Sequence, residues 1–405
     1  MDIMEPVSRA GVIGASSESV YAIEEARKRG IKVVAVDGVK SAPGLQHADE
    51  GHVVDIRDID AVFAFFDADP VDFLLPVPVG RILITSGAVN DRYGLPGIGK
   101  RGVDLSTDKW EFHRLLSSKG LRDAEAVLVT GAADIKETES MNYPVIFKPR
   151  FGSGSRAVKK YDSYEELLED TAELPLGEED FIAETCRQGT EYGVDAAVIN
   201  GEYRMILLRE KILTPPPYRQ CVGYYALEKT GERKDLFASV DGLVGKVVEV
   251  LGIDNCLLHA DVLYDGREAF LIEISPRPSG HYLHNYFTRY ATGFDMLGAY
   301  MDFASDPAAR GDYRIDYTYS AKSMLIKYFD LAEGIVRSLP DKAEIEAMPG
   351  VICYNCMMTA GDRIGMVTDG RSVMGRGFYI VEGPSLADCE SVCKEIENKI
   401  EIEEE

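Results

Sequence analysis

The chain has 405 residues, 45% of them apolar, and a formal net charge of −24. This length is enough for several hydrophobic cores, and the acidity excludes nucleic acid as an expected partner because a phosphate backbone would be repelled. No window approaches the ~18 consecutive apolar residues of a membrane span, and the start Met1-Asp-Ile-Met-Glu5 lacks the basic residues of a signal peptide. Seven scattered cysteines argue against a secreted disulfide framework. We therefore expect a cytoplasmic protein with no membrane association.

The first hundred residues alternate short apolar strands with helical patterns. Apolar runs at 10–14, 32–37, 50–55 and 73–76 are separated by helical patterns at 19–29 and 59–66. This alternation is typical of βαβ units and predicts an α/β domain with an open parallel sheet over residues 1–104.

Two glycine patterns in this region resemble nucleotide loops. The first, Gly14-Ala-Ser-Ser-Glu18, lacks the spacing of a dinucleotide fingerprint, although Asp37 closes the second strand at the distance expected for a ribose ligand. The second, Gly94 to Lys100, has phosphate-loop spacing but is followed by Arg101 where Ser or Thr would bind Mg²⁺. We interpret both as structural loops, because Gly and Pro clusters more often end elements than bind phosphate.

The rest of the chain divides into four predicted segments. A linking helical segment covers 105–142, with an N-cap at Ser106-Thr-Asp108, and a compact α+β unit covers 143–205. A central domain at 206–319 is followed by a small α+β domain at 320–405, whose final acidic run is expected to be a frayed, solvated end. Zinc binding by the cysteines at 353, 356, 389 and 393 is disfavoured, since Cys389 and Cys393 share an apolar helix face.

The segment Tyr143 to Arg156 is suited to a polyphosphate. Lys148 lies on a short apolar strand that leads into Gly152-Ser153-Gly154-Ser155. Small residues in such a turn expose backbone N–H groups, and the lysine adds a positive charge for phosphate oxygens.

A second stretch is suited to magnesium. Asp261 and Glu273 lie on apolar, strand-like runs joined by Tyr264-Asp-Gly-Arg267, which is a hairpin signal. The two carboxylates are therefore expected side by side on neighbouring strands, and hard carboxylate oxygens beside phosphates are what Mg²⁺ prefers. Together the two stretches predict an ATP site that uses a metal.

These residues resemble those of ATP-grasp enzymes, and within that superfamily the chain is most similar to the L-amino-acid ligases. The resemblance implies a multidomain α/β and α+β protein with the ATP-grasp fold: a Rossmann-like pre-ATP-grasp domain, a lid at 143–205 and a central domain carrying metal and substrate. It also implies that Lys109 and Lys148 contact ATP phosphates together with the turn at 152–155 (Gly152, Ser153, Gly154, Ser155). Glu184 would accept from the adenine amino group, the backbone of Thr185 and Cys186 would form the hinge against adenine, and Glu191 would meet the ribose.

The metal ligands implied by the resemblance are Asp261, Glu273 and Ser275. Two positions depart from the family pattern, because Asp261 stands where glutamate is usual and Ser275 where asparagine is usual. These changes leave open the number of Mg²⁺ ions, and Mn²⁺ is an alternative metal. Arg277 resembles the family arginine that steadies the transferring phosphoryl group, and it joins Lys148 as a catalytic candidate. The turn containing Ser279 and Gly280 would present backbone amides to the carboxylate being activated.

Four further residues are candidates for contacting substrate. His259 shares a strand face with Asp261 by period-two alternation, and a purely structural role for it is equally favoured. His281 follows the turn at Gly280. Lys211 and Arg219 flank the Pro215-Pro-Pro217 loop and are candidate carboxylate clamps, although either could equally lie in solvent.

The implied activity is an ATP- and Mg²⁺-dependent carboxylate–amine ligase. One substrate would form an acyl phosphate and an amine would displace phosphate, releasing ADP and giving an amide; the family suggests amino acids as substrates and a dipeptide as product. Family members are often dimers, which leaves a homodimer open. One alternative is an ATP-grasp enzyme that activates bicarbonate or a nucleotide-linked acid, of the carbamoyl phosphate or purine type. Another is an ATP-binding module that has lost turnover, with Asp261 and Ser275 as signs of decay.

Overall fold

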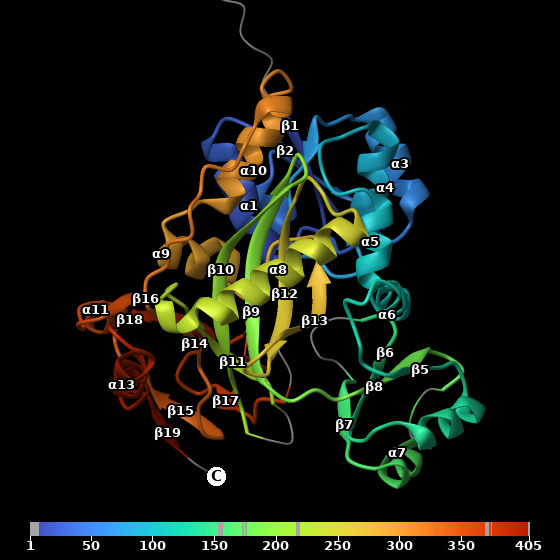
Figure 1. Ribbon diagram of the computed structural model, residues 1–405. Helices are drawn as coiled ribbons and strands as arrows, with labels where there is room; N and C mark the ends of the chain where they lie inside the picture. The colour runs from blue at the N-terminus through green and yellow to red at the C-terminus, as the bar shows by residue number, and fades with distance from the viewer. Residues whose placement is uncertain are drawn as a thin grey trace, which may run out of the picture.

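The computed structural model of the chain describes residues 8–152, 157–171, 174, 176–215, 219–368, 372, 373 and 375–403. In these residues the strands form a four-stranded N-terminal sheet, a second four-stranded sheet, an eight-stranded central sheet and a three-stranded sheet. Figure 1 shows the second four-stranded sheet, which is the lid, at the lower right and the three-stranded sheet at the lower left, with the central sheet above and between them. No helix among the described residues is long and apolar enough to cross a membrane.

The N-terminal sheet is parallel with the strand order β3-β2-β1-β4, as the alternating pattern predicted. Its strands and helices are β1 (Arg9–Ile13), α1 (Val20–Lys28), β2 (Lys32–Asp37), α2 (Pro43–His47), β3 (Glu50–Val53), α3 (Ile59–Ala68) and β4 (Phe73–Leu74). Asp37 accepts hydrogen bonds from the amides of Ala15 and Val39, at 2.7 and 2.8 Å. Its carboxylate therefore holds the loop after β1 in place, which explains its position without a dinucleotide.

Three helices connect this sheet to the rest of the molecule: α4 (Leu83–Tyr93), α5 (Lys100–Thr107) and α6 (Lys109–Ser118). Gly94 ends α4 in the left-handed region, with φ of 63°, so the glycine pattern at 94–100 is a helix-to-helix connection. Asp108 is the N-cap of α6 and accepts from the amides of Trp110 and Glu111, as the sequence predicted.

The lid is an antiparallel sheet in the order β5-β8-β6-β7 with its own apolar core. Its elements are β5 (Ala126–Val129), η2 (Ala132–Ser140), β6 (Val145–Pro149), β7 (Lys159–Tyr161), α7 (Tyr164–Asp170) and β8 (Phe181–Thr185). Because β5 belongs to this sheet, the expected boundary at 142/143 cuts through the lid. The expected boundary at 205/206 also cuts through a strand, since β10 runs across it in the central sheet.

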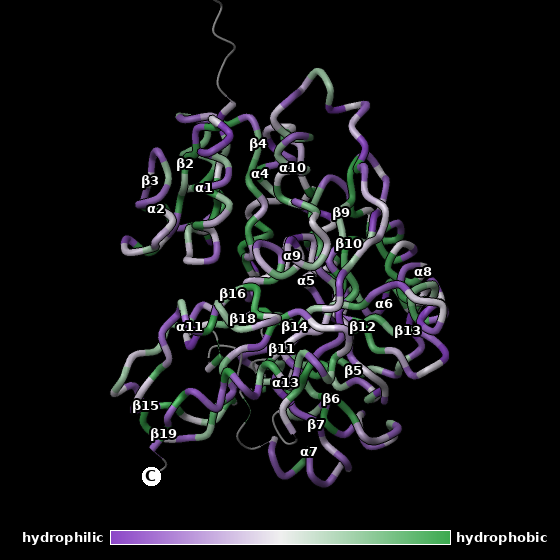
Figure 2. Tube along the Cα trace, turned by 90° about the vertical axis from the view of Figure 1, so that its left-hand side faces the viewer, coloured by the Kyte–Doolittle hydropathy of each residue, from purple (hydrophilic) through white to green (hydrophobic). Residues whose placement is uncertain are grey.

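The central sheet has the order β13-β12-β9-β10-β11-β14-β18-β16, with antiparallel neighbours throughout. Its first strands and the helices around them are β9 (Thr190–Ile199), β10 (Glu202–Leu213), β11 (Cys221–Ala226), η4 (Gly231–Arg233), α8 (Lys234–Leu251), β12 (Cys256–Tyr264), β13 (Ala269–Ser275), η5 (Leu283–Phe287), α9 (Thr288–Thr292), α10 (Met296–Ser305) and η6 (Arg310–Asp312). One sheet face packs on α8, and the other packs on α10 and the N-terminal domain. Figure 2 shows green, apolar stretches inside these layers and purple stretches along outer loops.

The C-terminal region contributes three strands to the central sheet and also forms the three-stranded sheet β17-β15-β19. Its elements are β14 (Met324–Tyr328), β15 (Gly334–Ser338), α11 (Lys342–Glu346), β16 (Val351–Cys356), β17 (Arg363–Ile364), β18 (Gly377–Glu382), α13 (Leu386–Glu397) and β19 (Glu401–Glu403). The final acidic run is therefore not frayed over 401–403, because it pairs with β15. Cys389 and Cys393 are buried in the large apolar core.

Candidate active site

The β12–β13 hairpin places the predicted metal ligands opposite one another. In the antiparallel register, Asp261 faces Glu273 and His259 faces Ser275, so the expectation of neighbouring carboxylates is confirmed. The register shifts by one residue directly after Asp261. Such a bulge re-aims side chains at the point where the hairpin carries its carboxylates.

Three ligand-type side chains converge there: atoms of His259, Asp261 and Glu273 lie within 4.8 Å of one another. Burial lowers the pKa of His259 to about 4, so its imidazole is neutral at pH 7. Arg209 Nη2 lies 3.3 Å from His259 Nδ1, which places the ring proton on Nε2, on the side of Asp261. The Oδ1 atom of Asp261 is buried without a hydrogen-bond partner and lies 3.6 Å from His259 Nε2. An unsatisfied carboxylate oxygen beside a neutral histidine and a second carboxylate is a donor set that fits a divalent cation.

Lys211 and Arg219, the candidate clamps, both contact carboxylates of the chain itself. Lys211 Nζ lies 2.6 Å from Asp261 Oδ2 and 3.6 Å from Glu191 Oε2, and Arg219 Nη2 lies 3.3 Å from Glu191 Oε1. Burial alone would lower the pKa of Lys211, but the two acids raise it above its usual value. Lys211 is thus a charged partner of the metal-site aspartate, and Glu191 is held between two cations.

The predicted phosphate residues share one pocket. It is lined by Lys109, Lys148, Glu273, Ser275 and Arg277, together with Gly80, Ser106, Thr107, Phe112, Arg122, Ile272 and Ile274. Lys109 donates to the carbonyl of Gly152 at 2.9 Å, which ties α6 to the start of the glycine turn. Burial, with a contribution from Lys148, lowers the pKa of Lys109. The pocket therefore gathers cations and a carboxylate from the lid, α6 and the hairpin; Ser153, Gly154 and Ser155 lie outside the described residues.

Glu184 occupies a buried ion cluster. It is 6% exposed, accepts from Lys148 Nζ at 2.7 Å and also accepts from Arg122 Nε at 2.7 Å. Burial opposes ionisation, yet Lys148 and Arg122 hold the pKa of Glu184 well below its usual range. Glu184 therefore fixes the phosphate lysine on its strand. Arg122 was missed by the sequence analysis, because an isolated arginine after a helix carries no motif; its guanidinium also lies over the rings of Phe112 and Phe270.

The hinge residues after Glu184 use their N–H groups within the lid. Thr185 donates to the carbonyl of Glu125 at 3.0 Å, and Cys186 donates to that of Pro144 at 2.8 Å. These two N–H groups are therefore already paired, and the expected adenine contact at Thr185 and Cys186 has only their carbonyl and side-chain atoms to use.

The turn after β13 brings in a residue from the N-terminal domain. The amide of His281 donates to Glu18 Oε1 at 2.6 Å, and its carbonyl accepts from the Tyr328 hydroxyl at 2.6 Å. The His281 amide is therefore occupied by a side chain of the protein. Burial lowers the pKa of Arg277, and the negative charges of Glu273 and Glu18 act in the opposite direction. No sequence pattern predicts this contact of Glu18, because its loop resembles only an imperfect dinucleotide fingerprint.

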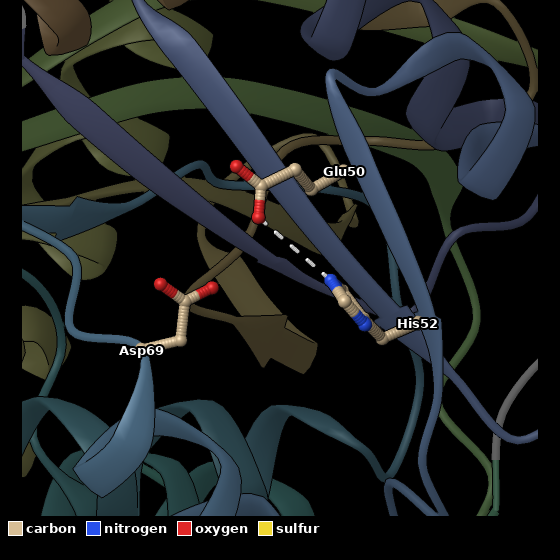
Figure 3. Close-up of side chains that lie close together, drawn as sticks. All are labelled: Glu50, His52 and Asp69. Carbon is tan, nitrogen blue, oxygen red and sulfur yellow. Dashed lines mark ion pairs between the residues drawn. The ribbon is translucent and has the colours of Figure 1, made fainter.

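A second cluster of the same composition lies on the N-terminal sheet, where Glu50, His52 and Asp69 approach one another (Figure 3). His52 Nε2 is 3.9 Å from Glu50 Oε2. Arg9 contacts both carboxylates, and Lys32 Nζ lies 2.5 Å from Glu50. Two cations thus neutralise this exposed cluster, and it carries no metal assignment.

Comparison with known proteins agrees with this geometry. The ATP-grasp domain family matches residues 106–281, and the family described as L-amino acid ligase C-terminal domain 2 matches residues 327–405. The chain has the ATP-grasp fold. More particularly, it joins an ATP-grasp domain to the C-terminal domain of L-amino acid ligases. The matches confirm the two expectations from the sequence, which were the ATP-grasp fold and a similarity to the L-amino-acid ligases.

Solved structures resemble the whole chain. The L-amino acid ligase from Bacillus licheniformis has a TM-score of 0.82 and 18% identity, covering 99% of this chain and 100% of that one. The phosphoribosylglycinamide synthetase from Anaerococcus prevotii has a TM-score of 0.75 and 19% identity, covering 99% and 100%. Among curated relatives, the formate-dependent phosphoribosylglycinamide formyltransferase of Methanocaldococcus jannaschii is 22% identical over 66% of this chain and 69% of its own length.

Proposed function

We propose that the protein is an ATP- and Mg²⁺-dependent ligase that joins a carboxylate to an amine through an acyl phosphate, with amino acids as substrates and a dipeptide or similar amide as product. The observation that carries this proposal is the convergence of Lys109, Lys148, Glu273 and Arg277 on one pocket. The C-terminal domain of L-amino acid ligases supports amino acids as the substrate class.

The residues divide the work by charge. Lys109 and Lys148 bind phosphate oxygens, and Glu184 with Arg122 keeps Lys148 at its position. Asp261, Glu273 and Ser275 would hold Mg²⁺ through their oxygen atoms, and His259 lies beside them on β12. A bound Mg²⁺ supplies neutralisation of charge on the transferring phosphoryl group. Arg277, half-buried in the same pocket as Glu273, would bind the phosphoryl oxygens.

The acid reacts without a protein nucleophile. Its carboxylate oxygen attacks the γ-phosphorus of ATP and the bond to ADP breaks, which gives the acyl phosphate. The amine nitrogen then bonds to the acyl carbon, and the C–O bond to phosphate breaks, releasing inorganic phosphate. Catalysis in this scheme rests on positioning and charge stabilisation, which suits a site built from lysines, an arginine and carboxylates.

The test is phosphate release from ATP and Mg²⁺ with the proteinogenic amino acids singly and in pairs, followed by mass spectrometry of the positive reactions. Release that needs two amino acids and gives their condensed mass supports a dipeptide ligase. Release with one acid alone, without an amide, contradicts it.

A second candidate keeps the same pocket but activates another acid. The curated relatives are formate-dependent phosphoribosylglycinamide formyltransferases, and one structural neighbour, a biotin carboxylase domain, was solved with MgADP and bicarbonate. Phosphate release with formate or bicarbonate, and none with amino acids, would favour this candidate. Silence with every acid, despite ATP binding, would favour an inactive ATP-binding module.

A further inference from the structure

Glu18 lies in a loop that the fold holds firmly. The loop leaves the carboxyl end of β1, a central strand of the parallel sheet, and such strand ends are where ligands bind in open α/β sheets. The Asp37 carboxylate accepts from Ala15 at 2.7 Å, and the Ser19 hydroxyl donates to the Gly14 carbonyl at 2.6 Å. The residues on both sides of Glu18 are therefore fixed.

The helix that follows, α1, is attached to the segment after the active-site turn. Arg29 Nη1 lies 2.6 Å from Asp302 on α10, and Arg289 donates to the Tyr21 hydroxyl at 2.8 Å. Apolar residues of α1 and α10 also share one core. Glu18 is thus held in a fixed position relative to the turn, although the two are 263 residues apart in sequence.

The Glu18 carboxylate lies directly on this turn. Its Oε1 atom accepts from the His281 amide, and a Cβ built at Gly280 would lie 2.9 Å from Oε1 and 3.1 Å from Oε2. Both His281 and Tyr282 have positive φ, of 59° and 61°, an arrangement that costs free energy and often marks a functional site. Among the described residues, the second oxygen of the half-buried Glu18 has no hydrogen-bond donor from the protein.

Within the described residues, Glu18 can be compared with three carboxylates at or beside the metal cluster. Asp261 pairs with Lys211, Glu273 belongs to the metal cluster, and Asp195 is fully buried against Arg209 at 2.5 Å. Glu18 is the one of the four that has neither a cationic side chain within 4.0 Å nor a place in the metal cluster. Glu18 is therefore available to pair with a cation that the protein itself does not supply.

We propose that Glu18 binds the ammonium group of the amine substrate and accepts one of its protons before attack. This inference rests on the proposed function. The ammonium transfers a proton to Glu18, the nitrogen lone pair forms the C–N bond to the acyl carbon, and the C–O bond to phosphate breaks. The second nitrogen proton leaves with the phosphate, and Glu18 returns its proton to solvent.

The test compares two nucleophiles in Glu18→Gln, which keeps an acceptor for the His281 amide and removes the charge. Hydroxylamine is largely uncharged at neutral pH and needs no base, so hydroxamate formation with the active acid should stay within about threefold of wild type. Amide formation with proteinogenic amino acids as amines should fall by ~100-fold, with a raised KM for the amine. Glu25→Gln, in the adjoining helix α1 and paired with Lys28, is the matched control and should leave both reactions unchanged.

Three outcomes would overturn the inference in different ways. Unchanged amide formation in Glu18→Gln removes the role, and equal loss of hydroxamate and amide with a native melting curve makes Glu18 a residue of the acid half-reaction. Absence of hydroxamate in the wild type with every acid would refute the proposed function, and this inference with it.

If Glu18→Gln does not fold, Glu18→Asp provides a second test, because it keeps the charge with a shorter reach. We then expect a raised KM for the amine with unchanged hydroxamate formation, and an unchanged KM for the amine would contradict the role.

Discussion

Two clusters of one histidine and two carboxylates occur in this molecule, and they differ in surroundings more than in composition. In the cluster at Glu50, His52 and Asp69, the side chains are 28–43% exposed, and Arg9 and Lys32 neutralise both acids. In the cluster at His259, Asp261 and Glu273, the first two side chains are 11% and 14% exposed, Glu273 is the most exposed member, and one carboxylate oxygen of Asp261 is left unsatisfied. Burial with an unpaired oxygen creates a demand for a cation, whereas exposed salt bridges already meet it.

The strongest test of this comparison is one alanine substitution in each cluster. Glu273→Ala should lower phosphate release by roughly three orders of magnitude, because metal stabilisation of the phosphoryl group is worth several kcal/mol. Glu50→Ala should stay within about twofold of wild type, since it removes only surface ion pairs. Comparable losses in the two variants would show that burial does not separate the clusters.

The buried ion pair behind the metal cluster should matter mainly for folding. Asp195 and Arg209 are both 0% exposed, and Arg209 Nη2 also contacts His259 Nδ1 at 3.3 Å. Asp195→Ala leaves the guanidinium buried without its partner, so the free energy of unfolding in urea should fall by about 3–5 kcal/mol. Asp302→Ala breaks a largely exposed pair with Arg29 and should lower the free energy of unfolding by less than about 1 kcal/mol. Equal losses in Asp195→Ala and Asp302→Ala would contradict the distinction between the buried and the exposed pair.

The buried ion cluster of Glu184 with Lys148 and Arg122 should make the free energy of unfolding depend on pH. The folded-state pKa of Glu184 lies well below its unfolded value, so its stabilisation is fully present above pH ~4.5 and is lost as pH falls through the folded pKa. Glu184→Gln should therefore lower the free energy of unfolding by about 2–3 kcal/mol at pH 7. The difference from wild type should shrink as the pH is lowered below ~4.5, and a constant difference would argue against the ion cluster.

The smallest effect is expected at the exposed cluster itself. Lys32→Ala removes the 2.5 Å contact with Glu50, but both side chains are more than 30% exposed. Urea unfolding should therefore change by less than about 1 kcal/mol, and the change should shrink further in high salt. A larger, salt-insensitive loss would mean that the cluster is more than a surface salt bridge.

The sequence predicted those parts of the site that lie in local patterns. The hairpin signal at Tyr264–Arg267 gave the register that places Asp261 opposite Glu273, and the cap at Asp108 positioned Lys109 at the start of α6. The alternation of apolar, strand-like runs with helical patterns predicted the parallel N-terminal sheet. These features depend on residues close together in the chain.

Features that depend on long-range packing could not be predicted in this way. Glu18 reaches the turn at His281 across 263 residues, and Arg122 pairs with Glu184 across 62. The pairing of Glu401–Glu403 with β15 was missed for the same reason, because an acidic run has no distinctive strand pattern. Such contacts are set by how whole elements pack.

The central claim is that the hairpin cluster holds the metal used with ATP. Electron paramagnetic resonance of Mn²⁺, titrated into the protein with ATP, measures this directly in the wild type, Glu273→Ala and Glu50→Ala. The account predicts a protein-bound Mn²⁺ signal in the wild type and Glu50→Ala that is lost in Glu273→Ala. A bound signal that survives in Glu273→Ala, or that disappears in Glu50→Ala, would contradict it.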